Sequence, residues 1–200
     1  MLLKAVAFDL DNTIATIPHL SWLQYPSAIP KMLALKNSSA FLRGFRTHHL
    51  NEKLDSDLRL RFSTPITLQD VDHIANTMYR NIEIHPAVKQ LVQACDQHKI
   101  PRAVLSDHPA IEKLKVLRFE EGWTCVLNAR AYGAFKPLPD ALYALCAQLN
   151  VYANELLYVG DRYDTDGEAC SKIGCHFVHL SHIDISKIVK SFSKSPKANR

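Results

Sequence analysis

Two aspartates separated by one residue are the first candidates for chemistry in this sequence. Asp9 and Asp11 follow directly on the apolar run Ala5–Phe8, and Thr13 comes two residues later. Alternate positions of an extended chain point to the same side, so one carboxyl group can face a substrate and the other its leaving group. The same spacing recurs further along the chain, but only this pair follows a run typical of a buried strand. A turn or helix-capping aspartate is the alternative.

A hydroxyl group and an ammonium group follow later apolar runs. Ser106 ends the run 103–106, just before a helix expected to begin near Pro109. Its hydroxyl and the free amides of that helix could bind phosphate. Lys136 stands near another expected strand end, where an ammonium group can neutralise both a carboxylate and a phosphoryl oxygen. An ordinary capping serine and a solvent-facing lysine are the alternatives.

Three aspartates within six residues form the most informative group. The apolar run Leu156–Gly160 is followed by Asp161, Asp164 and Asp166. Carboxylate oxygens are hard ligands that suit magnesium better than zinc. We therefore expect a cation site after this run, with a structural turn as the alternative.

These groups need a scaffold that brings separate strand ends together. Five short apolar runs rich in branched residues are each followed by a helix-like stretch: Leu3–Leu10, Arg102–Ser106, Thr124–Ala129, Leu156–Gly160 and His176–Leu180. This alternation predicts an α/β fold with a parallel sheet. Ligands of such sheets lie beyond the carboxyl ends of the strands, where the acids, the serine and the lysine should converge.

A long interval after the first run predicts an inserted module. About ninety residues separate the first run from the second, far more than one crossover helix needs. Residues 17–84 carry helical patterns and are expected to form a cap over the strand ends. The catalytic core would then comprise residues 1–16 and 85–186, followed by a basic, flexible tail at 187–200.

Taken together, the groups at the expected strand ends resemble the four motifs of the haloacid dehalogenase superfamily in order and spacing: Asp9, Asp11 and Thr13; Ser106; Lys136; and Asp161 with Asp166. The resemblance covers residues 1–182 and is to phosphatase-like members of the phosphoglycolate phosphatase type. It implies a doubly wound, Rossmann-like core with a small all-helical cap after the first motif.

The resemblance also implies roles for these residues. Asp9 would be the nucleophile and a metal ligand, while Asp11 would be the general acid and base and would bind the metal through its carbonyl oxygen. The remaining roles fall to Ser106, Lys136 and Thr13 for the phosphoryl group, and to Asp161 and Asp166 for Mg²⁺. The expected activity is magnesium-dependent hydrolysis of a small phosphorylated metabolite through an aspartyl phosphate.

Two alternatives remain beside this phosphatase hypothesis, and a third class, the carbon–halogen hydrolases, is disfavoured. A phosphomutase of the same superfamily would share every core residue used above. A phospho-accepting signalling module also combines acids, a hydroxyl and a lysine on a parallel sheet, although the long insert would be foreign to it. Carbon–halogen hydrolases of the superfamily do without the second aspartate and without metal, so Asp11 and Asp161 argue against them. Asp107, where many relatives carry asparagine, is a departure from the family pattern and leaves substrate choice open.

Composition and charge exclude several other classes. Five of the 24 lysines and arginines fall in 187–200, which holds no acid, so the rest is nearly balanced against 20 acidic residues. We therefore expect no nucleic-acid partner. Prolines interrupt the longest nearly uncharged run, 13–37, so no membrane span is expected. Lys4 and the first aspartates break the pattern of a secretory signal, which predicts a cytoplasmic protein. The oligomeric state stays open.

Cysteines and histidines near the end of the chain could suggest a zinc site. Cys170, Cys175, His176, His179 and His182 lie close together in the sequence. Strand alternation would send neighbouring ligands to opposite faces, and the spacing matches no common zinc site. We expect the five cysteines of the chain to be reduced and mostly buried.

Overall fold

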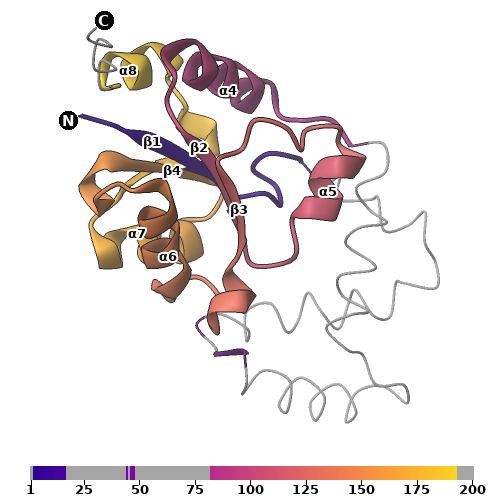
Figure 1. Cartoon of the computed structure of the whole chain (residues 1–200), viewed down its shortest axis with the longest axis vertical. Helices are drawn as coiled ribbons and strands as arrows, with labels where there is room; N and C mark the ends of the chain where they lie inside the picture. Colours follow the sequence, from indigo (N-terminus) through magenta and orange to yellow (C-terminus); the bar gives the residue numbers. More distant parts are fainter. Residues whose placement is uncertain (1, 17–43, 45, 48–81, 193–200) are drawn as a thin grey trace, which may run out of the picture.

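One parallel sheet forms the centre of the molecule (Figure 1). The structure, a computed structural model, describes residues 2–16, 44, 46–47 and 82–192. The five strands are β1 (Ala5–Phe8), β2 (Arg102–Ser106), β3 (Cys125–Asn128), β4 (Leu156–Gly160) and β5 (His176–His179). Their order is β3-β2-β1-β4-β5, so β1 is central. Each strand lies within one of the five apolar runs, which confirms the predicted α/β fold.

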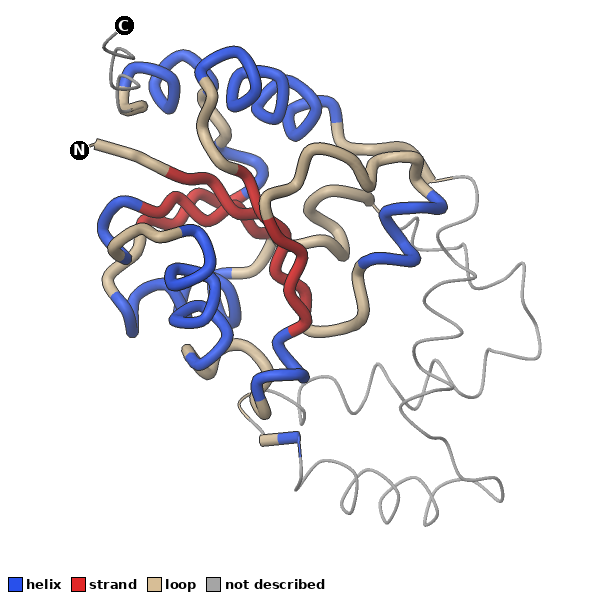
Figure 2. The backbone as a smooth tube through the Cα atoms, viewed as in Figure 1, coloured by secondary structure: helices blue, strands red, loops and turns tan. Residues whose placement is uncertain are grey.

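Helices cover both faces of this sheet (Figure 2). The α-helices are α4 (Pro86–His98), α5 (Ile111–Val116), α6 (Asp140–Leu149), α7 (Glu168–Ile173) and α8 (Ile185–Lys190). Single turns of other helix types are η3 (Ala129–Tyr132), η4 (Ala153–Glu155), η5 (Tyr163–Gly167) and η6 (Leu180–His182). In Figure 1, α4 and α8 lie on one side of the strands and α6 and α7 on the other. This is the doubly wound arrangement that the family resemblance implied.

Alternation along β1 explains why both faces are packed. Val6 and Phe8 belong to the core under α4, whereas Ala5 and Ala7 belong to the core under α6 and α7. Successive side chains of a strand point to opposite faces, so a strand covered on both sides is apolar throughout. All four residues of β1 are fully buried.

Local sequence sets where the two longest described helices begin. Pro86 occupies the first turn of α4, where its missing amide hydrogen has no partner to lose, and the His85 side chain accepts from the Ala87 N–H. In α6, Pro139 is the capping residue just before the helix. Both helices end at a residue with positive φ, Lys99 and Asn150 respectively.

The register of the strands brings their ends to one edge. Phe8 pairs with Val104 of β2 on one side and with Val159 of β4 on the other. The next residue, Asp9, therefore emerges beside the last residues of both neighbouring strands, and its N–H donates to the Val159 carbonyl at 2.8 Å. Residues that follow β1, β2 and β4 share one edge of the sheet.

The two ends of the long insert are joined to each other at that edge. Ala15 and Ile84 form an antiparallel bridge, and the His85 N–H donates to the Ile14 carbonyl at 2.8 Å. The predicted cap, 17–84, lies outside the described residues except for 44, 46–47 and 82–84.

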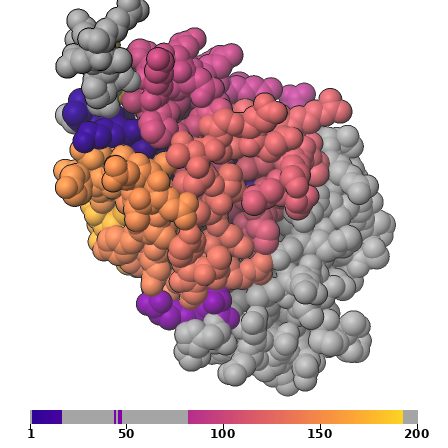
Figure 3. All heavy atoms as spheres, in the orientation of Figure 1, coloured from indigo at the N-terminus to yellow at the C-terminus, as the bar shows by residue number. Residues whose placement is uncertain are grey.

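One described piece of the insert contacts the core. Arg46 forms a bridge with Ala134 and an ion pair with Asp140 at 2.9 Å, and the Thr47 N–H donates to the Gly133 carbonyl at 3.0 Å. Figure 3 shows these residues in purple against the orange surface of the core. The insert therefore touches the loop that leads into Lys136.

The predicted tail begins within ordered structure. Lys187 to Lys190 belong to α8, where Ile188 is buried, and Phe192 is buried and bridged to Leu3. Apolar residues interleaved with the lysines give this stretch a face that packs on α4. Residues 193–200 lie outside the described part. No helix of that part is long and apolar enough to span a bilayer.

Candidate active site

Three carboxyl groups meet at the edge of the sheet where β1 and β4 end. Oxygen atoms of Asp9, Asp161 and Asp166 all lie within 4.8 Å of one another. Asp9 follows β1 directly, Asp161 follows β4 directly, and Asp166 comes from the turn η5. Asp166 is held there because its Oδ2 accepts from the Arg162 N–H at 3.2 Å.

The buried ammonium group of Lys136 lies among these acids. Its Nζ donates to Asp9 Oδ1 and to Asp166 Oδ1, both at 2.6 Å. The side chain is only 3% exposed. Because an unpaired buried charge is very costly, these contacts explain how a lysine is kept in the interior.

Tyr158 is a further member of this cluster that the sequence analysis did not identify. It lies in β4, is fully buried, and its hydroxyl is 3.0 Å from Lys136 Nζ. The hydroxyl donates to the Leu105 carbonyl at 2.8 Å. A tyrosine within an otherwise apolar strand was the available signal, because a buried hydroxyl needs a partner.

Thr13 and Ser106 lie at the same edge. The Thr13 hydroxyl donates to Asp9 Oδ2 at 3.4 Å. Ser106, almost fully buried at the end of β2, accepts from the His108 N–H at 3.3 Å. The structure thus places a buried hydroxyl group on the strand beside the one that carries Asp9.

Asp107, the departure from the family pattern, joins two of the predicted site segments. Its Oδ1 accepts from the Lys136 N–H at 3.0 Å. The loop after β2 is therefore tied directly to the segment that carries the buried lysine. This contact needs an acceptor oxygen and no charge.

Asp11 makes a second ion pair beside the cluster. Both of its carboxylate oxygens accept from Lys113 Nζ, at 2.9 and 2.8 Å. Lys113 belongs to α5, and no sequence pattern connects it with Asp11, which lies 102 positions away. The Asp11 side chain is 28% exposed, more than the side chains of Asp9 and Asp166.

Burial and repulsion between neighbouring carboxyl groups raise the pKa values of two acids in this cluster. Burial raises the pKa of Asp9 well above its usual value, the attraction of Lys136 lowers it in part, and Asp166 and Asp11 raise it further. Burial, followed by repulsion from Asp166, also raises the pKa of Asp161. For Lys136, burial lowers the pKa, but attraction to Asp166 and Asp9 prevails and leaves it well above its usual value. The cluster therefore favours additional positive charge.

A divalent cation fits this cluster. Three carboxyl groups, those of Asp9, Asp161 and Asp166, face one ammonium group, that of Lys136. If all are ionised, two negative charges remain, which one divalent cation cancels. The donors are all carboxylate oxygens, which suit hard cations.

Gly160 gives Asp166 the space that it occupies. A Cβ atom at Gly160 would overlap the Asp166 carboxyl group, with Cγ only 2.6 Å away. The end of β4 must therefore be a glycine if Asp166 is to reach Lys136.

The histidines and cysteines considered for zinc have other contacts. His179 Nε2 lies 2.7 Å from the Asp161 carbonyl oxygen, His176 Nε2 lies 3.0 Å from the Asn154 carbonyl oxygen, and the Tyr163 hydroxyl lies 3.2 Å from His182 Nδ1. His179 therefore contacts the backbone of the acidic loop. All five cysteines are free, and four of them are buried.

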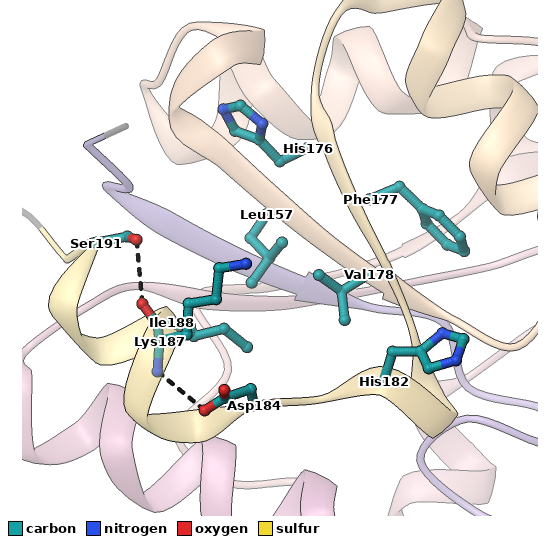
Figure 4. A pocket seen from close by; sticks show the side chains of 9 residues that line it. All are labelled: Leu157, His176, Phe177, Val178, His182, Asp184, Lys187, Ile188 and Ser191. Carbon is teal, nitrogen blue, oxygen red and sulfur yellow. Dashed lines mark hydrogen bonds between the residues drawn. The ribbon is translucent and has the colours of Figure 1, made fainter.

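A separate pocket lies at the β5 edge of the sheet (Figure 4). It is bounded by β5, by α8 and by the start of β4, and residues that line it include Leu157, His176, Val178 and Lys187. Lys136 and the three acids around it, Asp9, Asp161 and Asp166, do not line this pocket. It is thus distinct from the candidate active site.

The chain is similar in sequence to known hydrolases. The haloacid dehalogenase-like hydrolase family matches residues 3–174. The chain is 25% identical over 194 residues to a phosphoglycolate phosphatase of Mannheimia succiniciproducens, covering 90% of this chain and 86% of that protein. The chain belongs to the haloacid dehalogenase-like hydrolases.

Solved structures share the fold. A predicted phosphoglycolate phosphatase from Haemophilus somnus superposes with a TM-score of 0.61 at 19% identity, covering 96% of this chain and 94% of that one. The L-2-haloacid dehalogenase of Xanthobacter autotrophicus gives 0.63 at 17% identity, covering 94% and 82%. Because a protein named as a phosphatase and one named as a dehalogenase share this fold, the reaction must be argued from the site residues.

Proposed function

We propose that this hydrolase is a magnesium-dependent phosphatase that cleaves small phosphoric monoesters through an aspartyl phosphate on Asp9. The observation that carries the proposal is the surplus of carboxyl groups around the buried Lys136. Such a site attracts a divalent cation and then an anionic ligand. The relatives named phosphoglycolate phosphatase support the same substrate class.

In this mechanism Asp9 attacks the phosphorus atom. A new bond forms between an Asp9 carboxylate oxygen and phosphorus, while the bond to the leaving oxygen breaks. Lys136 offsets the negative charge of the carboxylate and the phosphoryl group. When bound by Asp9, Asp161 and Asp166, Mg²⁺ would supply further positive charge against this repulsion. Ser106 and Thr13 are proposed to hold phosphoryl oxygens.

Asp11 is proposed to move the protons. It gives a proton to the leaving oxygen in the first step and takes one from water in the second, when the water oxygen attacks phosphorus and the bond to Asp9 breaks. The Asp11 side chain is 28% exposed, so water can reach it. A dehalogenase reaction would need neither this residue nor a cation, which favours the phosphatase.

The nucleophile is tested with Asp9→Asn. We expect wild-type protein to release phosphate from p-nitrophenyl phosphate only with Mg²⁺, and the variant to lose at least a thousandfold in rate, because an amide is a poor nucleophile. Asp164→Asn is the matched control: this acid lies in the same loop as Asp161, is 46% exposed and pairs with Arg162. It should remain active. Undiminished turnover by Asp9→Asn would refute the assignment.

The substrate class is tested separately. A panel of phosphorylated small metabolites, with 2-phosphoglycolate first because of the named relatives, should show magnesium-dependent phosphate release from at least one member. Transfer of the phosphoryl group to another position of the same molecule would support a mutase instead. Halide release from a haloacid without added metal would support a dehalogenase.

A further inference from the structure

A second buried lysine lies outside the set that the family motifs define. Lys113 is 1% exposed although it belongs to α5, a helix of only six residues. Burying an ammonium group is costly unless an opposite charge accompanies it. We therefore expect a negatively charged partner to explain the burial of Lys113.

That partner is Asp11, which Lys113 contacts at two points. The ammonium group donates to Oδ1 at 2.9 Å and to Oδ2 at 2.8 Å. Contact with both oxygens restricts rotation of the carboxyl group about the bond that joins it to Cβ. One contact alone would leave that rotation freer.

The helix that carries Lys113 is itself anchored. The neighbouring Leu114 is buried at 1% exposure, and its N–H donates to the Ala110 carbonyl at 2.9 Å. The Phe119 N–H then donates to the Leu114 carbonyl at 2.9 Å. The lysine thus extends from a fixed backbone towards the loop after β1, and Figure 1 shows α5 beside that loop.

We propose that Lys113 is a positioning residue that holds the Asp11 carboxyl group in line for proton transfer. This inference rests on the phosphatase mechanism above, in which Asp11 protonates the leaving oxygen as the phosphorus–oxygen bond breaks and later accepts a proton from the attacking water. A displacement of about 1 Å in such a group can lower a rate about a hundredfold. Lys113 acts through Asp11 and is proposed to make no contact with the substrate.

Lys113→Met tests the inference, because methionine retains the length of the side chain and removes the ammonium group. Lys115→Met is the matched control: Lys115 lies two residues along the same helix, is 55% exposed and pairs with Glu112. Lys113→Arg is a second variant that retains a positive charge with a different reach. It also serves if Lys113→Met does not fold.

The informative measurement compares two leaving groups in the presence of Mg²⁺. An alkyl phosphate has a basic leaving oxygen that needs a proton, whereas p-nitrophenolate leaves without one. For Lys113→Met we expect a loss in kcat of about tenfold to a hundredfold on the alkyl phosphate. On p-nitrophenyl phosphate the first step should stay fast and the second should slow, which gives a burst of p-nitrophenolate equal to the enzyme concentration.

The outcomes separate positioning from a purely structural contact. A burst together with selective loss on the alkyl phosphate, partly restored in Lys113→Arg and absent in Lys115→Met, supports the proposal. Equal losses on both substrates without a burst would show that Lys113 only stabilises the fold, and would overturn it. Unchanged kinetics in both Lys113 variants would also overturn it.

Failure of the underlying function would look different. If wild-type protein released no phosphate from any substrate, the phosphatase proposal itself would fail, and the role of Lys113 would fail with it. If wild-type protein were active and Asp9→Asn inactive while both Lys113 variants matched wild type, only the inference about Lys113 would be wrong.

Discussion

Two buried lysines lie near the end of β1, and they differ in the charge that surrounds them. Lys136 faces three carboxyl groups, of which Asp9 and Asp166 are within 2.6 Å and nearly as buried as the lysine. Lys113 pairs with Asp11, whose side chain is 28% exposed. Among the described residues, the first site holds more carboxyl groups than ammonium groups, whereas Lys113 binds both oxygens of one carboxyl group, that of Asp11.

Both sites pair a lysine with aspartate, but the different surroundings suit them to different tasks. Around Lys136, burial above all raises the pKa of Asp9, which means that its ionised form is unfavourable there. A further cation would stabilise that ionised form. In the Lys113 pair, the ammonium group offsets the charge of the Asp11 carboxylate that it contacts. We therefore expect the first site to bind metal and phosphate, and the second to fix a side chain in place.

Of the substitutions at the two buried lysines, Lys136→Met should have the larger effect. Loss of the ammonium group leaves buried carboxylates without their partner, and phosphate release should fall about a hundredfold to a thousandfold. Steady-state kinetics on p-nitrophenyl phosphate measure this, with Lys115→Met as the exposed-lysine control. A loss no greater than that of Lys113→Met would remove the distinction between the two sites.

Metal binding should stabilise only the site with excess acid. With Mg²⁺ at about a hundred times its Kd, we expect about 2.7 kcal/mol of added stability, seen as a rise in Tm of several degrees. Asp161→Asn should reduce this rise and Lys113→Met should preserve it. Differential scanning calorimetry with and without Mg²⁺ measures this rise in Tm. If Lys113→Met abolished the rise, the expected difference between the two lysine sites would be wrong.

Tyr158→Phe tests how Lys136 is held. The substitution removes the hydroxyl that donates to the Leu105 carbonyl and lies 3.0 Å from Lys136 Nζ. We expect a loss of about 1 kcal/mol in stability by urea unfolding and a severalfold lower kcat. A decrease in stability with unchanged kcat would show that the hydroxyl serves the fold alone.

The smallest effect should come from Asp107→Asn. The amide oxygen of asparagine can still accept the hydrogen bond from the Lys136 N–H, now 3.0 Å from Asp107 Oδ1. Activity and Tm should therefore stay close to wild type, whereas Asp107→Ala should lose about 1 kcal/mol of stability. A large loss in Asp107→Asn would mean that the charge itself matters.

Much of the fold followed from sequence pattern. The five apolar runs predicted the strands because a sheet covered on both faces requires apolar residues throughout each strand, as β1 shows. The meeting of Asp9 and Asp161 followed from the rule that the carboxyl ends of parallel strands share an edge. Lys136 reaches them from the segment between η3 and α6, beyond the end of β3. Their catalytic roles stay predictions.

Other parts could not be predicted because they depend on contacts between distant positions. Lys113 stands in a charged stretch, and nothing local distinguishes it from the exposed Lys115. Its burial is decided by where α5 packs, which the pattern of one helix does not specify. The start of the tail at 187 was placed by counting lysines, although Ile188 and Phe192 are buried.

The bridge between Ala15 and Ile84 has a consequence for how this protein can be altered. Ala15 follows shortly after Asp9, and Ile84 pairs with Ala15 while the His85 N–H donates to the Ile14 carbonyl. The predicted insert, residues 17–84, therefore leaves the core and returns to it at adjacent points, and Arg46 within it contacts the core at Ala134 and Asp140. Exchanging it for the corresponding segment of a relative should leave the strand ends undisturbed while offering the reaction a different range of molecules.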